Sequence, residues 1–164
     1  MATLSVQASA EASTKTTIHA GGFTLTIDEP PLFGGEGAAP SPVEFLLASL
    51  AGCINAIGQW VAREMGFPLH KLDVDVSGEV DSGRFLKGDQ SARAGFTKIH
   101  AMIRVQADTD EASLEAWARQ VEDRCPVIDN LRDATLFTMA VQGTAARASE
   151  DMAPAAQTSE AQGT

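Results

Sequence analysis

Two cysteines are the residues of this chain best suited to redox chemistry. Cys125 stands in the sequence Arg124-Cys125-Pro126-Val127, and proline is favoured at the first position of a helix. Cys125 would then cap that helix, with its sulfur near unsatisfied N–H groups and the cation of Arg124. Such surroundings favour the reactive thiolate. The alternative interpretation is a buried structural cysteine beside a helix-ending proline.

The other cysteine, Cys53, lies in the apolar segment 43–65, which predicts a long helix. Apolar surroundings raise the pKa of a thiol, so the local sequence favours a core residue here rather than a nucleophile. Cys53 would become reactive if a cation reached it from elsewhere in the fold. From the local sequence alone, Cys125 is therefore the better nucleophile.

Glu44 is an acidic candidate at the start of this helix. Ser41 is a capping residue, Pro42 suits the first helical position and Glu44 completes a capping box, so a structural role accounts for the glutamate. The helical spacing puts Glu44 and Cys53 on opposite faces. A joint chemical role would require a second chain or bound groups between them.

Other kinds of site are excluded by missing patterns. His19, His70 and His100 have no metal-ligand spacing with the cysteines, and no metal site is predicted. The segment 34–37 lacks the glycine spacing of a phosphate-binding loop, and no Gly-x-Ser-x-Gly motif marks a serine nucleophile. The sequence predicts no bound cofactor.

The chain has 164 residues, of which 44% are hydrophobic and 21% charged, and its net charge is −10. This length suits one domain with a real core. The negative charge excludes nonspecific nucleic-acid binding, which depends on Lys and Arg neutralising phosphates, and it disfavours an anionic membrane surface. The segment 43–65 is long enough to cross a bilayer. Its polar residues make it a poor match for such a span: Glu44, Asn55, Gln59, Arg63 and Glu64.

The N-terminal residues 1–17 lack a basic start followed by an apolar run, so no signal peptide is predicted. Two cysteines are also too few for a disulfide-stapled secreted scaffold. We therefore expect a cytoplasmic protein whose cysteines are thiols by default.

The hydrophobic pattern predicts an α+β domain with antiparallel sheet over 14–142, between a flexible N-terminus, 1–13, and a disordered C-terminal tail, 143–164. The 43–65 helix is apolar all round, which predicts burial on every side. A homodimer that buries this helix between two chains is the economical arrangement. The other predicted elements are strands at 23–27, at 72–77 within the segment 69–80, at 96–106 and at 135–141, and helices at 109–123 and 127–131.

The segment Pro40-Ser-Pro-Val-Glu44-Phe-Leu-Leu-Ala-Ser-Leu-Ala-Gly-Cys53 resembles the central helix of the OsmC/Ohr family. Two later segments agree with it: 95–105 resembles a strand of the family, and 121–131 resembles its second-cysteine motif. The two cysteine motifs in the right order make the resemblance specific. It covers roughly residues 15–142.

This resemblance implies an intertwined homodimer with antiparallel sheets around a long buried central helix. It also implies a thiol peroxidase that reduces organic hydroperoxides, with Cys53 as the attacking thiolate, Cys125 as the resolving cysteine and Glu44 in the site. An external dithiol would reopen the resulting disulfide. The implied order of the two cysteines reverses the ranking from the local sequence, and we follow the order that the family implies.

The sequence departs from one branch of the family near the helix. In the hydroperoxide-resistance members, an N-terminal arginine stabilises the thiolate, and a glutamate directly after the helix proline orients that arginine. Here Val43 follows Pro42, and no arginine precedes Arg63. The alternative function is therefore a non-catalytic dimer that binds a small ligand or senses oxidants. Four residues offer a substitute cation: Lys15, His19, Arg84 and Arg93.

Overall fold

The computed structural model describes residues 2–143. The chain divides into two units, Met1–Ala134 and Thr135–Thr164, and the helices and strands belong to the first. In chain order they are β1 (Val6–Ser9), β2 (Thr16–Ala20), β3 (Phe23–Ile27), the 3-10 helix η1 (Pro31–Phe33), α1 (Pro42–Met65), β4 (Leu69–Val80), α2 (Gly83–Lys87), β5 (Phe96–Ala107), α3 (Glu111–Arg124) and α4 (Pro126–Arg132).

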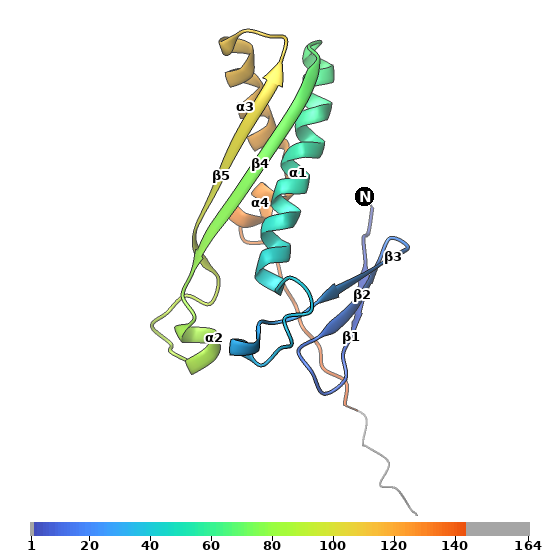
Figure 1. Cartoon of the computed structure of the whole chain (residues 1–164), viewed down its shortest axis with the longest axis vertical. Coiled ribbons are helices and arrows are strands. Elements are labelled where there is room, and N and C mark those ends of the chain that lie inside the picture. Colours follow the sequence, from blue (N-terminus) through green and yellow to red (C-terminus); the bar gives the residue numbers. More distant parts are fainter. Residues whose placement is uncertain (1, 144–164) are drawn as a thin grey trace, which may run out of the picture. The chain divides into compact units, whose positions relative to one another are not determined.

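The described strands form two antiparallel sheets. One is the meander β1-β2-β3, and the other is the long ribbon β4-β5, in which Val74 pairs with Ile103. The ribbon lies alongside α1, and the α3–α4 segment packs on the same helix (Figure 1). The predicted α+β class with antiparallel sheet is confirmed. Gly21 and Gly22 connect β2 to β3 with φ angles of 55° and 84°, the left-handed backbone that a tight hairpin turn requires.

The prediction of a flexible N-terminus over 1–13 is wrong for the four residues of β1. Val6 and Ala8 alternate with Gln7 and Ser9, but all four side chains are exposed, so the alternation does not mark a half-buried strand here. The strand forms because its backbone pairs with β2, with Val6 opposite Ala20 and Ser9 opposite Thr17. Strand β2 was likewise not predicted, and it lies between β1 and β3.

The start of α1 confirms the capping box. The Ser41 hydroxyl accepts a hydrogen bond from the Glu44 backbone at 3.4 Å, and the Glu44 carboxylate accepts one from the Ser41 backbone at 2.7 Å. The helix ends at Gly66, whose φ of 79° is the left-handed conformation that favours glycine. These signals fix both ends of the helix that carries Cys53.

Burial of α1 is one-sided within a single chain, so burial on every side, which was expected between two chains, stays a prediction. Four large apolar residues of one face belong to the core: Leu50, Ile54, Ile57 and Val61. Trp60, in contrast, is 54% exposed. α1 is long enough and apolar enough to cross a membrane, but the core helix of a soluble protein meets the same two criteria. Its exposed apolar residues show that one chain does not supply the full cover that the pattern demands.

The predicted last strand, 135–141, is absent. These residues have no regular secondary structure, and their apolar side chains are exposed, as at Leu136 and Phe137. An alternating sequence becomes a strand only when another strand supplies its backbone hydrogen bonds, and none does so among the residues described. The predicted disordered tail, 143–164, lies outside the described residues except for Gly143.

Candidate functional site

The sulfurs of Cys53 and Cys125 lie 2.8 Å apart, and the Cys125 thiol donates a hydrogen bond to Cys53 Sγ across 72 positions of sequence. Both cysteines are free thiols; Cys53 is partly buried and Cys125 is fully buried. The disulfide that the family resemblance implies requires the two sulfurs to lie close together, and a single chain brings them together. The peroxidatic and resolving roles stay predictions.

A break between two helices delivers Cys125 to this position. Cys125 ends α3 and begins α4 with an extended backbone, at φ −80° and ψ 111°. Pro126 has no N–H to donate, so α3 cannot continue through it. Both α3 and α4 contact α1. The Trp117 indole of α3 donates a hydrogen bond to the Gly58 carbonyl of α1 at 2.9 Å, which holds the two helices together near the thiols.

The pKa of the Cys53 thiol is raised, first because burial disfavours the thiolate and second because of the hydrogen bond with the neighbouring Cys125 thiol. Hydrogen bonding from the Val127 backbone, at the start of α4, lowers the same pKa and opposes these two effects. The sequence predicts that the N-terminus of this helix favours the thiolate of Cys125. In the structure its backbone forms a hydrogen bond with Cys53 instead. The Cys125 side chain makes no capping hydrogen bond.

Arg124 does not serve the cysteine beside it in sequence. Its guanidinium binds both carboxylate oxygens of Glu64 on α1, with a distance of 3.0 Å from Nη2 to Oε1. Three of the proposed substitute cations contact other groups: Lys15 pairs with Glu36 at 3.1 Å, His19 approaches Thr24 Oγ1 at 3.2 Å, and Arg84 donates to the Gln90 carbonyl at 2.9 Å. Among residues 2–143, no cation contributes to the pKa of Cys53.

Glu44 acts as a helix cap within one chain. Its Oε2 accepts hydrogen bonds from both the backbone N–H and the hydroxyl of Ser41, each at 2.7 Å, and these bonds lower the pKa of Glu44. The rise of an α-helix separates Glu44 from Cys53 by about 13 Å along the axis. The structure therefore does not bring Glu44 to the thiols of its own chain, and its place in the catalytic site stays a prediction.

The histidines also stand apart from the thiols. His70 pairs with Asp108, with a distance of 2.9 Å from Nε2 to Oδ2. Within the described part of the chain, no cluster of three or more His, Cys, Asp or Glu side chains could hold a metal ion. The chemistry available at this site is that of two adjacent thiols.

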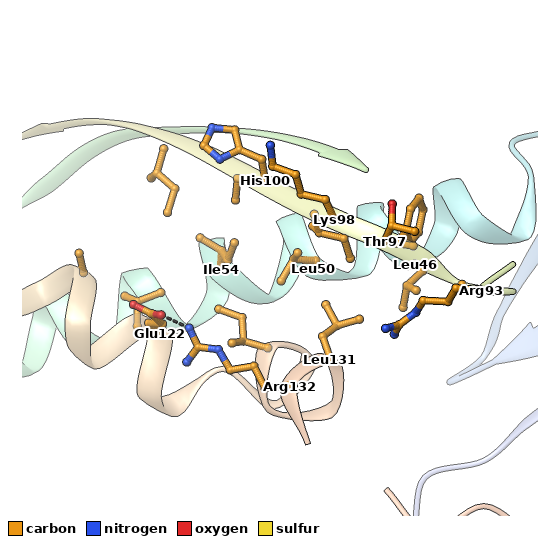
Figure 2. A pocket seen from close by; sticks show the side chains of 18 residues that line it. Leu46, Leu50, Ile54, Arg93, Thr97, Lys98, His100, Glu122, Leu131 and Arg132 are labelled. Carbon is orange, nitrogen blue, oxygen red and sulfur yellow. Dashed lines mark hydrogen bonds and ion pairs between the residues drawn. The ribbon is translucent and has the colours of Figure 1, made fainter. Parts of the chain in front are cut away.

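A cavity of about 670 Å³ lies between α1, β5, α3 and α4. Leu50 and Ile54, which flank Cys53 along α1, line it, whereas neither cysteine is among its lining residues (Figure 2). Leu50 and Ile54 are apolar neighbours of Cys53 in the sequence, whereas nothing in the sequence predicts the β5 side of the cavity. That side depends on how the ribbon packs, for which the sequence holds no local signal.

The model of the OsmC-like protein family matches residues 35–140, more than half of the chain, including α1 and both cysteines. The chain belongs to the OsmC-like family. No curated protein matches this sequence. As an OsmC-like protein it has its two thiols side by side, as the resemblance of its motifs implied.

Solved structures share the fold of this OsmC-like chain at low sequence identity. The OsmC-like protein from Mycoplasma pneumoniae is 19% identical with a TM-score of 0.70, and the match covers 81% of this chain and 89% of that one. An organic hydroperoxide resistance protein OsmC from Legionella pneumophila is 19% identical, with a TM-score of 0.59 and coverage of 80% and 90%. An organic hydroperoxide resistance protein from Elizabethkingia anophelis is 12% identical, with a TM-score of 0.57 and coverage of 82% and 91%.

Proposed function

We propose that this OsmC-like protein is a thiol-dependent peroxidase that reduces organic hydroperoxides, with Cys53 as the peroxidatic and Cys125 as the resolving cysteine. The contact between the two sulfurs, 2.8 Å apart, is the observation that carries the proposal. A resolving thiol must reach an oxidised sulfur without a large rearrangement, and Cys125 is already in place. Hydrogen bonding from the Val127 backbone to Cys53 supports the attacking role for Cys53, because this bond lowers the pKa of that thiol.

The reaction runs in three balanced steps. The Cys53 thiolate attacks one oxygen of the O–O bond; that bond breaks, the sulfur becomes a sulfenic acid, and the leaving alkoxide takes a proton to become an alcohol. The Cys125 thiol then attacks the sulfenic sulfur, forming a disulfide and releasing water. An external dithiol reduces the disulfide to two thiols and is itself oxidised to a disulfide. A reducing cytoplasm would supply such a dithiol, and we propose that compartment.

The raised pKa of Cys53 favours a second candidate, a dimer that binds a small ligand or senses oxidants without turning over peroxide. A protonated Cys53 reacts slowly, so the pair would oxidise once and act as a switch. Steady-state turnover separates the two candidates, because a peroxidase consumes many equivalents of peroxide and a sensor consumes one.

We further propose that the protein functions as a homodimer built on the exposed face of α1. Trp60 is 54% exposed on this helix, and Phe23 of the β1-β2-β3 sheet is 74% exposed. Covering exposed apolar groups of this size with a second chain lowers the free energy of the protein. The glycine at 52 and the alanine at 56 are also exposed and leave room for another helix.

The test of the proposed activity is peroxide consumption by the pure protein with cumene hydroperoxide and excess dithiothreitol. We expect many turnovers for the natural chain and none for Cys53→Ser. Arg119→Gln, which changes a surface ion pair on α3, serves as the control and should retain full activity. Peroxide consumption no faster than with dithiothreitol alone would reject the peroxidase, and oxidation of the natural chain by a single equivalent without dithiothreitol would then support the oxidant sensor.

A further inference from the structure

The cavity between α1, β5, α3 and α4 combines an apolar lining with an excess of cations. Leu46, Leu50 and Ile54 recur along one side of α1 and line it, and the β5 ribbon faces them (Figure 2). Its volume of about 670 Å³ lies within the range of small-molecule sites. The eight helical steps from Leu46 to Ile54 span about 12 Å, which is roughly the reach of a medium-length acyl chain.

The charged groups of the cavity wall do not balance. Arg132 and Glu122 form an ion pair with each other, and Lys98 lies 3.9 Å from Glu79. Arg93, near Leu46 and Leu131, has no hydrogen bond or ion pair with any residue that the structure describes (Figure 2). An unpaired cation beside an apolar lining is unusual in a chain of net charge −10.

We propose that this cavity binds an acyl chain that carries a carboxylate, with the carboxylate on Arg93 and the tail along Leu46, Leu50 and Ile54. A guanidinium binds a carboxylate through two parallel hydrogen bonds, and the apolar wall gains free energy from covering the tail. The site is separate from the thiols, since neither cysteine lines it. Binding needs no redox step, so it stands or falls independently of the proposed peroxidase.

The test is calorimetric titration of the full, reduced chain with dodecanoate below its micelle concentration. We expect saturable binding of one dodecanoate per chain, and dodecanol, which has the same tail without the charge, should bind about tenfold more weakly. Arg93→Gln should weaken dodecanoate binding by about the same factor and leave dodecanol binding unchanged. Arg119→Gln removes a cation outside the cavity and should change neither affinity.

A second variant keeps the proposal testable if Arg93→Gln fails to fold. Leu131 lines the cavity and is 36% exposed, so the surface tolerates a polar side chain there. Leu131→Glu places a negative charge beside Arg93 and should weaken dodecanoate binding much more than dodecanol binding. Equal affinities for the two ligands, an unchanged affinity in both variants, or no saturable binding because a second copy covers the cavity would each overturn the proposal.

Discussion

The indole N–H of Trp117 donates a hydrogen bond to the carbonyl of Gly58 at 2.9 Å, and this contact joins α3 to the helix that carries Cys53. A Cβ atom on Gly58 would lie 2.8 Å from the Trp117 ring, which is closer than carbon atoms pack. Glycine at this position therefore allows the close approach of two helices. The same approach sets Cys125, at the end of α3, against Cys53.

We predict that Gly58→Ala destabilises the protein by about 1–3 kcal/mol, because the added methyl group pushes Trp117 away from α1. Gly95→Ala, outside any helix or strand, is the control, since a Cβ there meets only the Arg93 side chain at 3.8 Å, an ordinary van der Waals contact. That variant should change the stability by less than about 0.5 kcal/mol. Urea unfolding of both variants measures the difference, and equal stabilities would refute the packing argument.

The raised pKa of Cys53 predicts how its reactivity depends on pH. The thiolate is the reactive form, so a raised pKa leaves most of Cys53 protonated at neutral pH, and its reaction rate should still be rising with pH at about 8.5. The measurement is the rate of alkylation by iodoacetamide, with mass spectrometry to assign the label to Cys53. A plateau reached below neutral pH would contradict this prediction and reveal a cation supplied by another chain.

The proposed dimer predicts that a charge on the exposed face of α1 separates the subunits. Trp60→Glu should shift the protein from dimer to monomer in sedimentation velocity at micromolar concentration, because a buried carboxylate without a partner is costly. Ala112→Glu, at an exposed position of α3, is the control and should remain dimeric. A natural chain that sediments as a folded monomer would rule out the dimer.

Asp28 should stabilise the protein except in acid. Its buried carboxylate accepts hydrogen bonds from Thr14 and from the backbones of Glu29, Glu36 and Ala38, at 2.8–3.0 Å, and the pKa of Asp28 is lowered, chiefly by the bond from Ala38. A lowered pKa means that the carboxylate contributes stability above its unfolded pKa, and that this contribution is lost as pH falls through the folded pKa.

Asp28→Asn tests this account by thermal unfolding. The variant should melt at a lower temperature than the natural chain at about pH 7 and should lose less stability between about pH 7 and about pH 3. Asp108→Asn, which alters only an exposed pair with His70, should follow the natural chain because such pairs contribute little. If the melting temperatures of Asp28→Asn and the natural chain fall in parallel with pH, Asp28 is not the cause of the loss of stability in acid.

Local signals in the sequence predicted the elements that carry the site. The capping box at Ser41 and Glu44 marked the start of α1, and the alternation of 72–77 predicted the central part of β4. The dipeptide Cys125-Pro126 correctly predicted a break between two helices. Each of these features depends on neighbouring residues, which is why a single sequence contains enough information for them.

Contacts between distant segments were not predictable in the same way. Whether the backbone at the start of α4 bonds to Cys125 or to Cys53 depends on how α4 packs on α1. Arg124 likewise pairs with Glu64, which is 60 positions away in the sequence. Strand β1 depends on backbone pairing with β2 rather than on its own side chains. The alternation of 135–141 predicted a strand that does not form, because no described strand pairs with this segment.

The most direct test of the proposed chemistry is to locate the oxygen after one turnover in Cys125→Ser. This variant lacks the resolving thiol, so an equivalent of cumene hydroperoxide should leave a sulfenic acid on Cys53, which dimedone traps for mass spectrometry of the labelled peptide. We predict one dimedone label at Cys53, and none at Cys125 when Cys53→Ser is treated in the same way. A label on Cys125 in the Cys53→Ser protein, or no label on either variant, would contradict the assignment of Cys53 as the peroxidatic cysteine.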